Sequence, residues 1–275
     1  MKTENLINQI KQKKSFLCVG LDVDLDKIPK HLYKHEDPIF EFSKSIIDST
    51  SPFAIAYKPN IAFFESYGIK GWNSLEKVIN YINSNYPEIF TIADAKRGDI
   101  GNTSTKYAKT FFETLNFDSI TVAPYMGRDS VEPFLEYENK HTILLSLTSN
   151  SGSSDFQFQS DKGIPLYLSV IKKSQNWKNN DNLMYVVGAT KAKSLKEIRK
   201  IIPNSFLLVP GFGAQGGSLS DVCDFGLNDN CGIIVNSSRQ ILYSDNSTDY
   251  AKKSAEVSSL IQKEMSNELS KKGII

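Results

Sequence analysis

The chain has 275 residues, which could hold one large α/β domain or two small ones; a single α/β barrel of roughly 250 residues would fit with little left over. It is 40% hydrophobic and 23% charged, as soluble globular proteins are, and its net charge of +1 gives no electrostatic reason to expect binding to nucleic acid or a membrane. No apolar stretch approaches the roughly 20 residues that span a bilayer, and the amino terminus lacks the apolar core of a signal peptide. Because the three cysteines are odd in number, we expect free thiols and a cytoplasmic location.

Short apolar segments rich in Val, Ile and Phe recur along the chain, with helix-like segments between them. We expect eight strands buried on both faces, at residues 16–21, 53–57, 89–93, 119–123, 142–147, 183–187, 206–209 and 232–235. Eight strand–helix repeats at this length favour a closed (β/α)8 TIM barrel forming a single domain over residues 1–275. An open doubly wound sheet is the alternative, but no G-x-G-x-x-G motif follows the first strand.

Capping signals mark several helices between these strands. Asp37, followed by proline, predicts a helix start, because its side chain can cap the first N–H groups and proline suits the first helical position. Ser194 and Glu197 have the spacing of a capping box. Apolar residues spaced along the chain from Tyr250 predict a closing amphipathic helix. The polar stretch 149–162 has no obvious element, and a loop of that length is expected to be functional or disordered.

Charged residues follow three neighbouring strands at the points where these strands end. Asp22 follows the first strand and Lys58 the second. The third strand leads into Asp94-Ala-Lys96, and Asp99 begins the loop beyond. Residues two apart on a strand point the same way, so we expect Asp94 and Lys96 to share a face. Active sites of barrels lie at the carboxyl ends of the strands, and charges held there must be paired to offset lost hydration. The pattern therefore indicates a catalytic site.

A second signal follows the seventh and eighth strands. The glycine-rich segment 210–217 lets backbone N–H groups approach an anion closely at the start of a helix. Arg239 comes one βα repeat after Gln215, just past the eighth strand. Barrels commonly bind phosphate in these two loops, so the pattern predicts a phosphate site.

Two histidines, His31 and His35, are four residues apart, as metal ligands on a helix can be. Their segment is polar, however, and neither a cysteine nor a third histidine is placed to complete a set of ligands. We therefore expect surface histidines and no metal site.

The motifs together resemble the orotidine 5′-phosphate decarboxylase family, in its longer bacterial branch. They span nearly the whole chain: LCVGLD at 17–22, AYKPNIAFFE at 56–65, DAKRGDIGNT at 94–103, LTSN at 147–150, VGAT at 187–190, PGFGAQGG at 210–217 and NSSR at 236–239. The resemblance implies decarboxylation of orotidine 5′-monophosphate (OMP) to uridine 5′-monophosphate (UMP) and CO2, the last step of de novo UMP synthesis. It also implies that neither a metal nor an organic cofactor takes part.

The resemblance further implies catalytic roles for individual residues. Lys96 would protonate C6 of the pyrimidine as the carboxylate departs. Asp94 would lie close to the leaving carboxylate, and Lys58 would help hold the array. Asp99 and Thr103 would reach into the pocket of a partner chain, so that the two sites of a homodimer are shared.

Substrate contacts are implied in the same way. Asp22 and Lys58 would contact the ribose hydroxyls, and Ser149 would bind the pyrimidine and meet the glutamine of the phosphate loop. The other implied contacts are Asn60 to the ring and Gln215, Ser238 and Arg239 to the phosphate. Some branches of the family have glycine at position 238, but the serine found here keeps the backbone N–H.

Two alternative functions remain open. Sugar-phosphate decarboxylases and synthases on a similar barrel share an Asp-x-Lys-x-x-Asp core but use magnesium and an enediolate, and this motif offers no added carboxylate to assign to a metal. A non-catalytic nucleotide sensor would keep the phosphate site and bind UMP without turnover. The intact charge array argues against the sensor.

Overall fold

The computed structural model describes residues 1–212 and 217–275. All eight predicted strands are present in this part of the chain, and they form a closed barrel in the order β1-β10-β9-β8-β5-β4-β3-β2, which confirms the predicted fold class. The strands are β1 (Leu17–Leu21), β2 (Ala54–Pro59), β3 (Phe90–Arg97), β4 (Ser119–Val122), β5 (His141–Leu147), β8 (Leu183–Val187), β9 (Leu207–Val209) and β10 (Ile233–Ser237). β3 runs four residues further than the sequence predicted, so it carries its charged motif on the strand itself.

By their contacts, the described residues fall into two compact units. The first comprises residues 1–95, 115–117 and 236–275, and therefore holds β1, β2 and most of β3. The second comprises residues 96–114 and 118–235, with β4, β5, β8, β9 and most of β10.

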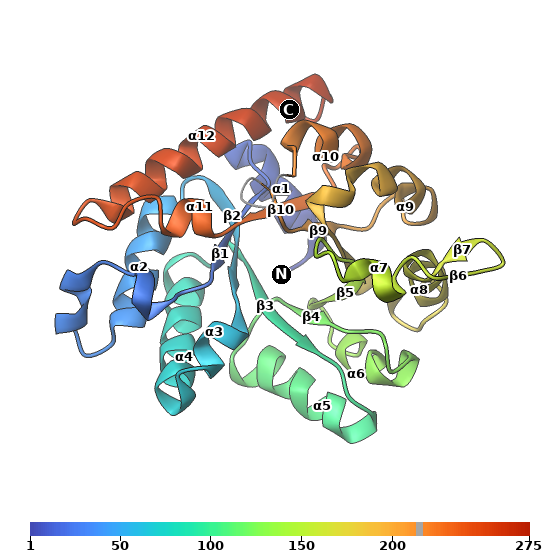
Figure 1. Cartoon of the computed structure of the whole chain (residues 1–275), viewed down its shortest axis with the longest axis horizontal. Helices are drawn as coiled ribbons and strands as arrows, with labels where there is room; N and C mark the ends of the chain where they lie inside the picture. The colour runs from blue at the N-terminus through green and yellow to red at the C-terminus, as the bar shows by residue number, and fades with distance from the viewer. Residues whose placement is uncertain (213–216) are drawn as a thin grey trace. The chain divides into compact units, whose positions relative to one another are not determined.

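In the first unit, α2 packs between α12 and α4, as Figure 1 shows. The start of α2 is fixed as the sequence predicted: Asp37 accepts a hydrogen bond of 3.0 Å from the backbone N–H of Phe40, and proline occupies the first turn. Ser74 and Lys77 of α4 donate to the same carboxylate, at 2.8 and 2.9 Å, so the cap also joins two helices. The helices of this unit are α1 (Thr3–Lys13), η1 (Leu25–Lys27), η2 (Lys30–Lys34), α2 (Pro38–Thr50), α3 (Ile61–Glu65), α4 (Gly68–Asn85), α11 (Arg239–Leu242) and α12 (Tyr250–Lys271).

The first and last helices differ in how clearly the sequence predicts them. The closing helix α12 buries Tyr250, Ile261 and Met265, which confirms the predicted amphipathic pattern. The opening helix α1 was not predicted, because only Leu6 and Ile10 of its eleven residues are buried.

The second unit contains helices and a small hairpin, β6 (Ser160–Asp161) with β7 (Ile164–Pro165), which lies beside α8 in Figure 1. The stretch 149–162 is therefore not free of elements, since it holds α7 and one strand of this hairpin. Its pieces are only two to four residues long, too short to show a periodic pattern. The helices are α5 (Gly101–Lys109), η3 (Thr110–Thr114), η4 (Arg128–Ser130), α6 (Glu132–Leu135), α7 (Ser153–Phe156), α8 (Leu166–Ser174), η5 (Asn180–Asn182), η6 (Ala189–Ser194), α9 (Leu195–Ile201) and α10 (Leu219–Gly226).

The predicted capping box at Ser194 is wrong. The serine has helical backbone angles (φ −70°, ψ −20°) and its side chain makes no capping hydrogen bond. The cause is the preceding helix η6, which runs directly into α9, whereas a capping residue normally has extended backbone.

Arg199 of α9 is a partly buried cation that binds backbone groups. Its guanidinium donates to four carbonyl oxygens, of Ile202, Ser205, Gly226 and Gly232, at 2.7–3.2 Å. Burial lowers the pKa of this arginine to about 10, which still leaves it charged at neutral pH. The residue thus joins three segments of the second unit through their main chains.

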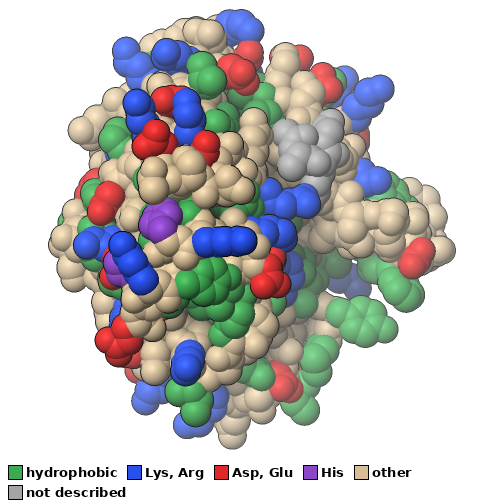
Figure 2. Space-filling view, turned by 60° about the vertical axis from the view of Figure 1, so that its left-hand side comes forward, with side chains coloured by type: hydrophobic (Ala, Val, Ile, Leu, Met, Phe, Trp, Pro, Cys, Tyr) green, Lys and Arg blue, Asp and Glu red, His purple; other side chains and the backbone are tan. Residues whose placement is uncertain are grey.

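Charged side chains of both signs lie interspersed on the face that Figure 2 draws, in keeping with the net charge of +1. Among the helices of residues 1–212 and 217–275, none is both long and apolar enough to cross a membrane.

Candidate active site

The centre of the first unit's charged cluster is Lys58, at the carboxyl end of β2. Its side chain is almost fully buried, and its Nζ donates a hydrogen bond of 2.7 Å to Oδ2 of Asp94 on β3. Oδ1 of Asp22, which follows β1, lies 4.0 Å from the same nitrogen. The predicted meeting of charges at three neighbouring strand ends is therefore confirmed for these three residues.

The two carboxylates keep Lys58 charged. Burial by itself lowers the pKa of the ammonium group, but the negative charges of Asp94 and Asp22 raise it further than burial lowers it. The net result is a pKa above that of an ordinary lysine. A permanent cation between two carboxylates is thus part of the site at neutral pH.

One oxygen of Asp22 has an unusual environment. Oδ1 is buried, and among the residues that the structure describes it has no hydrogen-bond partner. The 4.0 Å to Lys58 is too long for a hydrogen bond, so only electrostatic attraction remains. A buried carboxylate oxygen without a donor is costly, and a hydroxyl group of a bound ligand can supply the missing donor.

The carboxyl end of β10 packs against β1. Asn236 donates 3.2 Å to Oγ of Ser238, while the buried thiol of Cys18 donates 3.5 Å to Oδ1 of Asn236. Burial raises the pKa of this thiol to about 12, so it stays protonated. A Cβ atom at Gly20 would lie 1.9 Å from Oγ of Ser238, so a larger residue at position 20 would have to displace the Ser238 side chain. Arg239 follows directly, at the start of α11, with its side chain exposed.

Asn60 lies beside Asp94 through the main chain. The two residues form an isolated parallel bridge, just beyond the regular pairing of β2 with β3. Asn60 precedes α3, but its side chain makes no capping hydrogen bond to that helix. Asn60, which is predicted to contact the pyrimidine ring, therefore lies next to the charged cluster.

In the second unit, Lys96 has left-handed backbone geometry, with φ of +48°. Its backbone N–H donates 2.9 Å to Oγ1 of Thr121 on β4, and its side chain is exposed. The argument that Asp94 and Lys96 share a face assumed extended backbone throughout, and this assumption does not hold at Lys96. Left-handed geometry costs roughly 1–3 kcal/mol at a residue other than glycine and is found disproportionately at functional sites.

Asp99 and Thr103 lie in one turn at the start of α5. The backbone N–H of Asp99 donates 3.1 Å to Oγ of the buried Ser104, and its Oδ1 accepts 2.8 Å from the N–H of Ile100. Ser104 in turn donates 2.7 Å to the carbonyl oxygen of Asp99. Thr103 is exposed. The turn is thus fixed by local hydrogen bonds while its threonine faces outward.

Ser149 follows β5 and lies against β8. A Cβ atom at Gly188 would be 2.7 Å from the Cα of Ser149, so glycine is required where these two segments meet. Gln157 holds the loop by accepting from the N–H of Thr148 and donating to its Oγ1, both at 2.8 Å. The predicted phosphate contact Gln215 lies outside the described residues.

Several supporting residues were not predicted as part of the site. Cys18, Gly20 and Asn236 lie within the recognised motifs but were given no role, because none of the three side chains is charged. Among residues 1–212 and 217–275, no three His, Cys, Asp or Glu side chains are grouped so that they could hold a metal ion. His31 instead packs against the ring of Tyr250, with centroids 6.0 Å apart. The absence of a metal from the reaction stays a prediction.

Enzymes built on a (β/α)8 barrel carry their active-site groups at the carboxyl ends of the strands. This chain forms such a closed barrel and has ionic groups at these strand ends, so it has the architecture of a barrel enzyme. The sequence pattern of the orotidine 5′-phosphate decarboxylase / HUMPS family matches residues 15–254. The chain belongs to this family.

Similar proteins and solved structures align with nearly the whole of this chain. The chain is 66% identical over 265 residues to the orotidine 5′-phosphate decarboxylase of Flavobacterium johnsoniae, covering 96% of this chain and 97% of that protein. The structure of Leishmania donovani OMP decarboxylase is similar with a TM-score of 0.80 and 37% identity, covering 95% of this chain and 99% of that one. Leishmania donovani UMP synthase matches with a TM-score of 0.82 and 38% identity, but this chain spans only 57% of its length.

Proposed function

We propose that this protein decarboxylates OMP to UMP and CO2 in pyrimidine biosynthesis. Family membership, with 66% identity to a decarboxylase over nearly the whole chain, supports the reaction. The observation that carries the chemistry is the buried Lys58 cation, 2.7 Å from Asp94 and 4.0 Å from Asp22. It puts fixed charges of both signs at the end of the barrel where active sites of this fold are built.

The reaction needs fixed charges because it passes through a carbanion. The bond between C6 and the carboxylate breaks, CO2 leaves, and the electron pair stays on C6. We assign Lys96 as the acid that gives C6 its proton. Asp94, close to the leaving carboxylate, favours its departure by repulsion, and Lys58 holds Asp94 in place. Charges that are already oriented before the reaction stabilise developing charge without reorganisation.

The ribose is assigned to Asp22 and Lys58. The buried Oδ1 of Asp22 lacks a hydrogen-bond donor among the described residues, which suits a sugar hydroxyl. Nζ of Lys58 lies 4.0 Å from the same oxygen and places a positive charge beside it. A hydroxyl that donates to an ionised carboxylate forms a strong, charge-assisted bond.

The phosphate is assigned to Arg239, Gln215 and the backbone N–H of Ser238. The exposed guanidinium of Arg239 suits an anion that arrives from solvent. Ser149, at the end of β5, is assigned to the pyrimidine, with Asn60 as a further ring contact. Binding energy from the phosphate can then support the chemical step as well as affinity.

We further propose a homodimer in which Asp99 and Thr103 of one chain complete the site of the other. Thr103 is exposed, and so are apolar side chains in the same loop and in the one after β4. Ile100 is 59% exposed, Met126 49% and Tyr125 91%. Large apolar side chains exposed together are typical of an interface.

The domain and the compartment are also proposals. The family match runs from residue 15 to 254 through both compact units, which supports one decarboxylase domain over 1–275. Three buried free cysteines are compatible with the reducing cytoplasm.

The test of the function is a direct assay with protein dialysed against a chelator. Decarboxylation of OMP is followed by the fall in its absorbance, and full activity is expected. Turnover of a sugar phosphate that depends on magnesium, with none of OMP, would favour the related sugar-phosphate enzymes. Binding of UMP without turnover would favour a nucleotide sensor.

Replacing Lys96 tests the proposed acid. Lys96→Ala is expected to reduce turnover of OMP to the detection limit, because no other group is assigned to protonate C6, while UMP binding measured by calorimetry stays close to that of the wild type. The exposed Lys252 of α12 provides a control, since Lys252→Ala should leave both quantities unchanged. Wild-type turnover by Lys96→Ala would refute the assignment.

A further inference from the structure

Three tyrosine hydroxyl groups hold the segment that follows β1. Tyr243 donates 2.8 Å to the carbonyl oxygen of Asp22 and accepts 2.8 Å from the N–H of Asp24. Tyr67 accepts 3.0 Å from the N–H of Leu25, and Tyr33 donates to the carbonyl oxygen of the same leucine. Two of the four bonds, including the one to Asp22 itself, are made by Tyr243.

The direction of the Tyr243 bonds is fixed by their partners. A backbone N–H can only donate, so the phenol oxygen must accept from Asp24, and its own proton is left for the carbonyl of Asp22. Burial raises the pKa of this phenol, and the N–H of Asp24 lowers it by less, so the net pKa lies above that of an ordinary tyrosine. The hydroxyl therefore keeps its proton, and can donate, throughout the neutral range.

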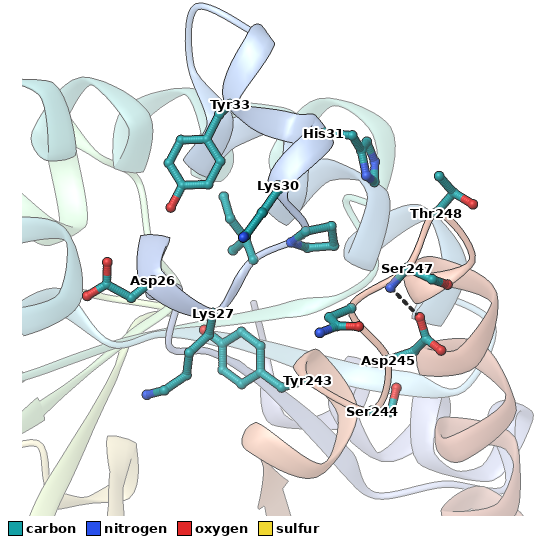
Figure 3. Close-up of a pocket in the computed structure, with 13 residues that line it drawn as sticks. Asp26, Lys27, Lys30, His31, Tyr33, Tyr243, Ser244, Asp245, Ser247 and Thr248 are labelled. Carbon is teal, nitrogen blue, oxygen red and sulfur yellow. Dashed lines mark hydrogen bonds between the residues drawn. The ribbon is translucent and has the colours of Figure 1, made fainter.

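The ring of Tyr243 is itself held firmly. It stacks on Phe42 of α2, with centroids 6.1 Å apart and an interplanar angle of 12°. On another side, Nζ of Lys27 lies 5.9 Å from the ring centroid. Figure 3 shows Tyr243 and Lys27 side by side at the edge of a surface groove. The hydroxyl can thus be removed without displacing the ring.

Tyr243 also connects two parts of the proposed site. It follows α11, the short helix that begins with the proposed phosphate ligand Arg239. Its hydroxyl binds the backbone of Asp22, the proposed ribose ligand. Because Tyr243 links the end of α11 to the backbone of Asp22, it fixes the position of the Asp22 carboxylate relative to the helix that begins with Arg239.

We infer that Tyr243 is a positioning residue that holds the Asp22 carboxylate for recognition of the ribose. The inference rests on the proposed assignment of Asp22 to a ribose hydroxyl. Oδ1 of Asp22 depends on a ligand for its hydrogen bond, so its position must match that ligand closely. Misplacement by about 1 Å is enough to cost a large factor in a preorganised site.

The experiment measures ribose discrimination in Tyr243→Phe. Dissociation constants are determined by calorimetry for UMP, 2′-deoxy-UMP and 3′-deoxy-UMP. The wild type is expected to bind UMP more tightly than at least one deoxy compound, by tenfold or more. Tyr243→Phe is expected to reduce that ratio by about fivefold or more, since it loses two hydrogen bonds to the Asp22 segment. A role in stability alone would leave the ratio unchanged.

Tyr81→Phe is the matched control. Its hydroxyl donates 2.6 Å to Oδ1 of Asp48 on the outer helices, and its removal is the same chemical change away from Asp22. We expect its discrimination ratio to equal that of the wild type. In Asp22→Asn, the further change Tyr243→Phe is expected to have little effect on the ratio, because the group being positioned is already altered.

Failure of the inference about Tyr243 can be distinguished from failure of the proposed function. A wild-type ratio in Tyr243→Phe overturns the inference and leaves the proposed function untouched. If the wild type decarboxylates OMP but does not discriminate the ribose, the assignment of Asp22 fails, and the inference with it. Because the ratio is a binding measurement, it supports or overturns the inference even if OMP is not turned over.

Discussion

Removing the Lys58 ammonium group is expected to destabilise the protein strongly, by an amount that depends on pH. At an effective dielectric constant of about 20, unit charges 2.7 Å apart attract by about 6 kcal/mol and charges 4.0 Å apart by about 4 kcal/mol. Desolvation of the lysine cancels part of this. Loss of one partner from a buried ion pair typically costs ~3–5 kcal/mol of unfolding free energy. We expect a loss in that range for Lys58→Met at pH 8.

The loss should shrink as the pH falls. Without the cation, the negative charges of the partly buried Asp94 and Asp22 repel each other with no positive charge between them, and protonation of a carboxylate at low pH removes this repulsion. The destabilisation is therefore greatest at high pH and is relieved toward pH 5. Urea unfolding followed by tryptophan fluorescence measures it at both values, and Lys58→Met with Asp94→Asn should recover part of the loss.

The exposed pair of Lys77 with Asp37 provides the control for this experiment. Lys77→Met removes a lysine–aspartate contact of 2.9 Å in which half of the lysine side chain is exposed. Its unfolding curve should stay close to that of the wild type. A loss below about 1 kcal/mol for Lys58→Met at pH 8, or equal losses at pH 8 and pH 5, would refute the argument from buried charge.

Two further predictions concern the carboxyl end of β10. Arg239→Ala is expected to lower kcat/KM for OMP by roughly 100-fold, as loss of a charge-assisted phosphate contact does, and an efficiency equal to that of the wild type in steady-state kinetics would contradict the assignment. Gly20→Ala places a Cβ atom 1.9 Å from Oγ of Ser238 and is expected to cost about 1–3 kcal/mol in urea unfolding. Adding Ser238→Gly should recover most of that cost, and the steric explanation is wrong if it does not.

The strands could be predicted from sequence because strands of a closed barrel are buried on both faces. Segments such as Leu183–Val187 are then apolar throughout and stand out from their surroundings. The opening helix could not be found in this way, because it buries two residues among many polar ones. The capping box at Ser194 failed because the motif describes a helix that starts from extended chain, and another helix precedes it here.

The charged cluster of Asp22, Lys58 and Asp94 was predictable from topology. Parallel strands in a barrel end at the same side, so charges at successive strand ends meet. The geometry of Lys96 was not predictable, because nothing in the residue type signals left-handed backbone. The role of Tyr243 could not be predicted from the sequence either, because its hydrogen-bond partners are main-chain groups of a segment more than two hundred residues away.

At position 96, the left-handed backbone favours one residue type and the proposed chemistry requires another. Glycine would adopt a φ of +48° without the steric penalty that a side chain incurs, so the fold alone would favour glycine there. Glycine has no ammonium group, and the proposed proton donor would be lost. Variants selected only for resistance to heat are therefore expected to gain stability at this site while becoming inactive.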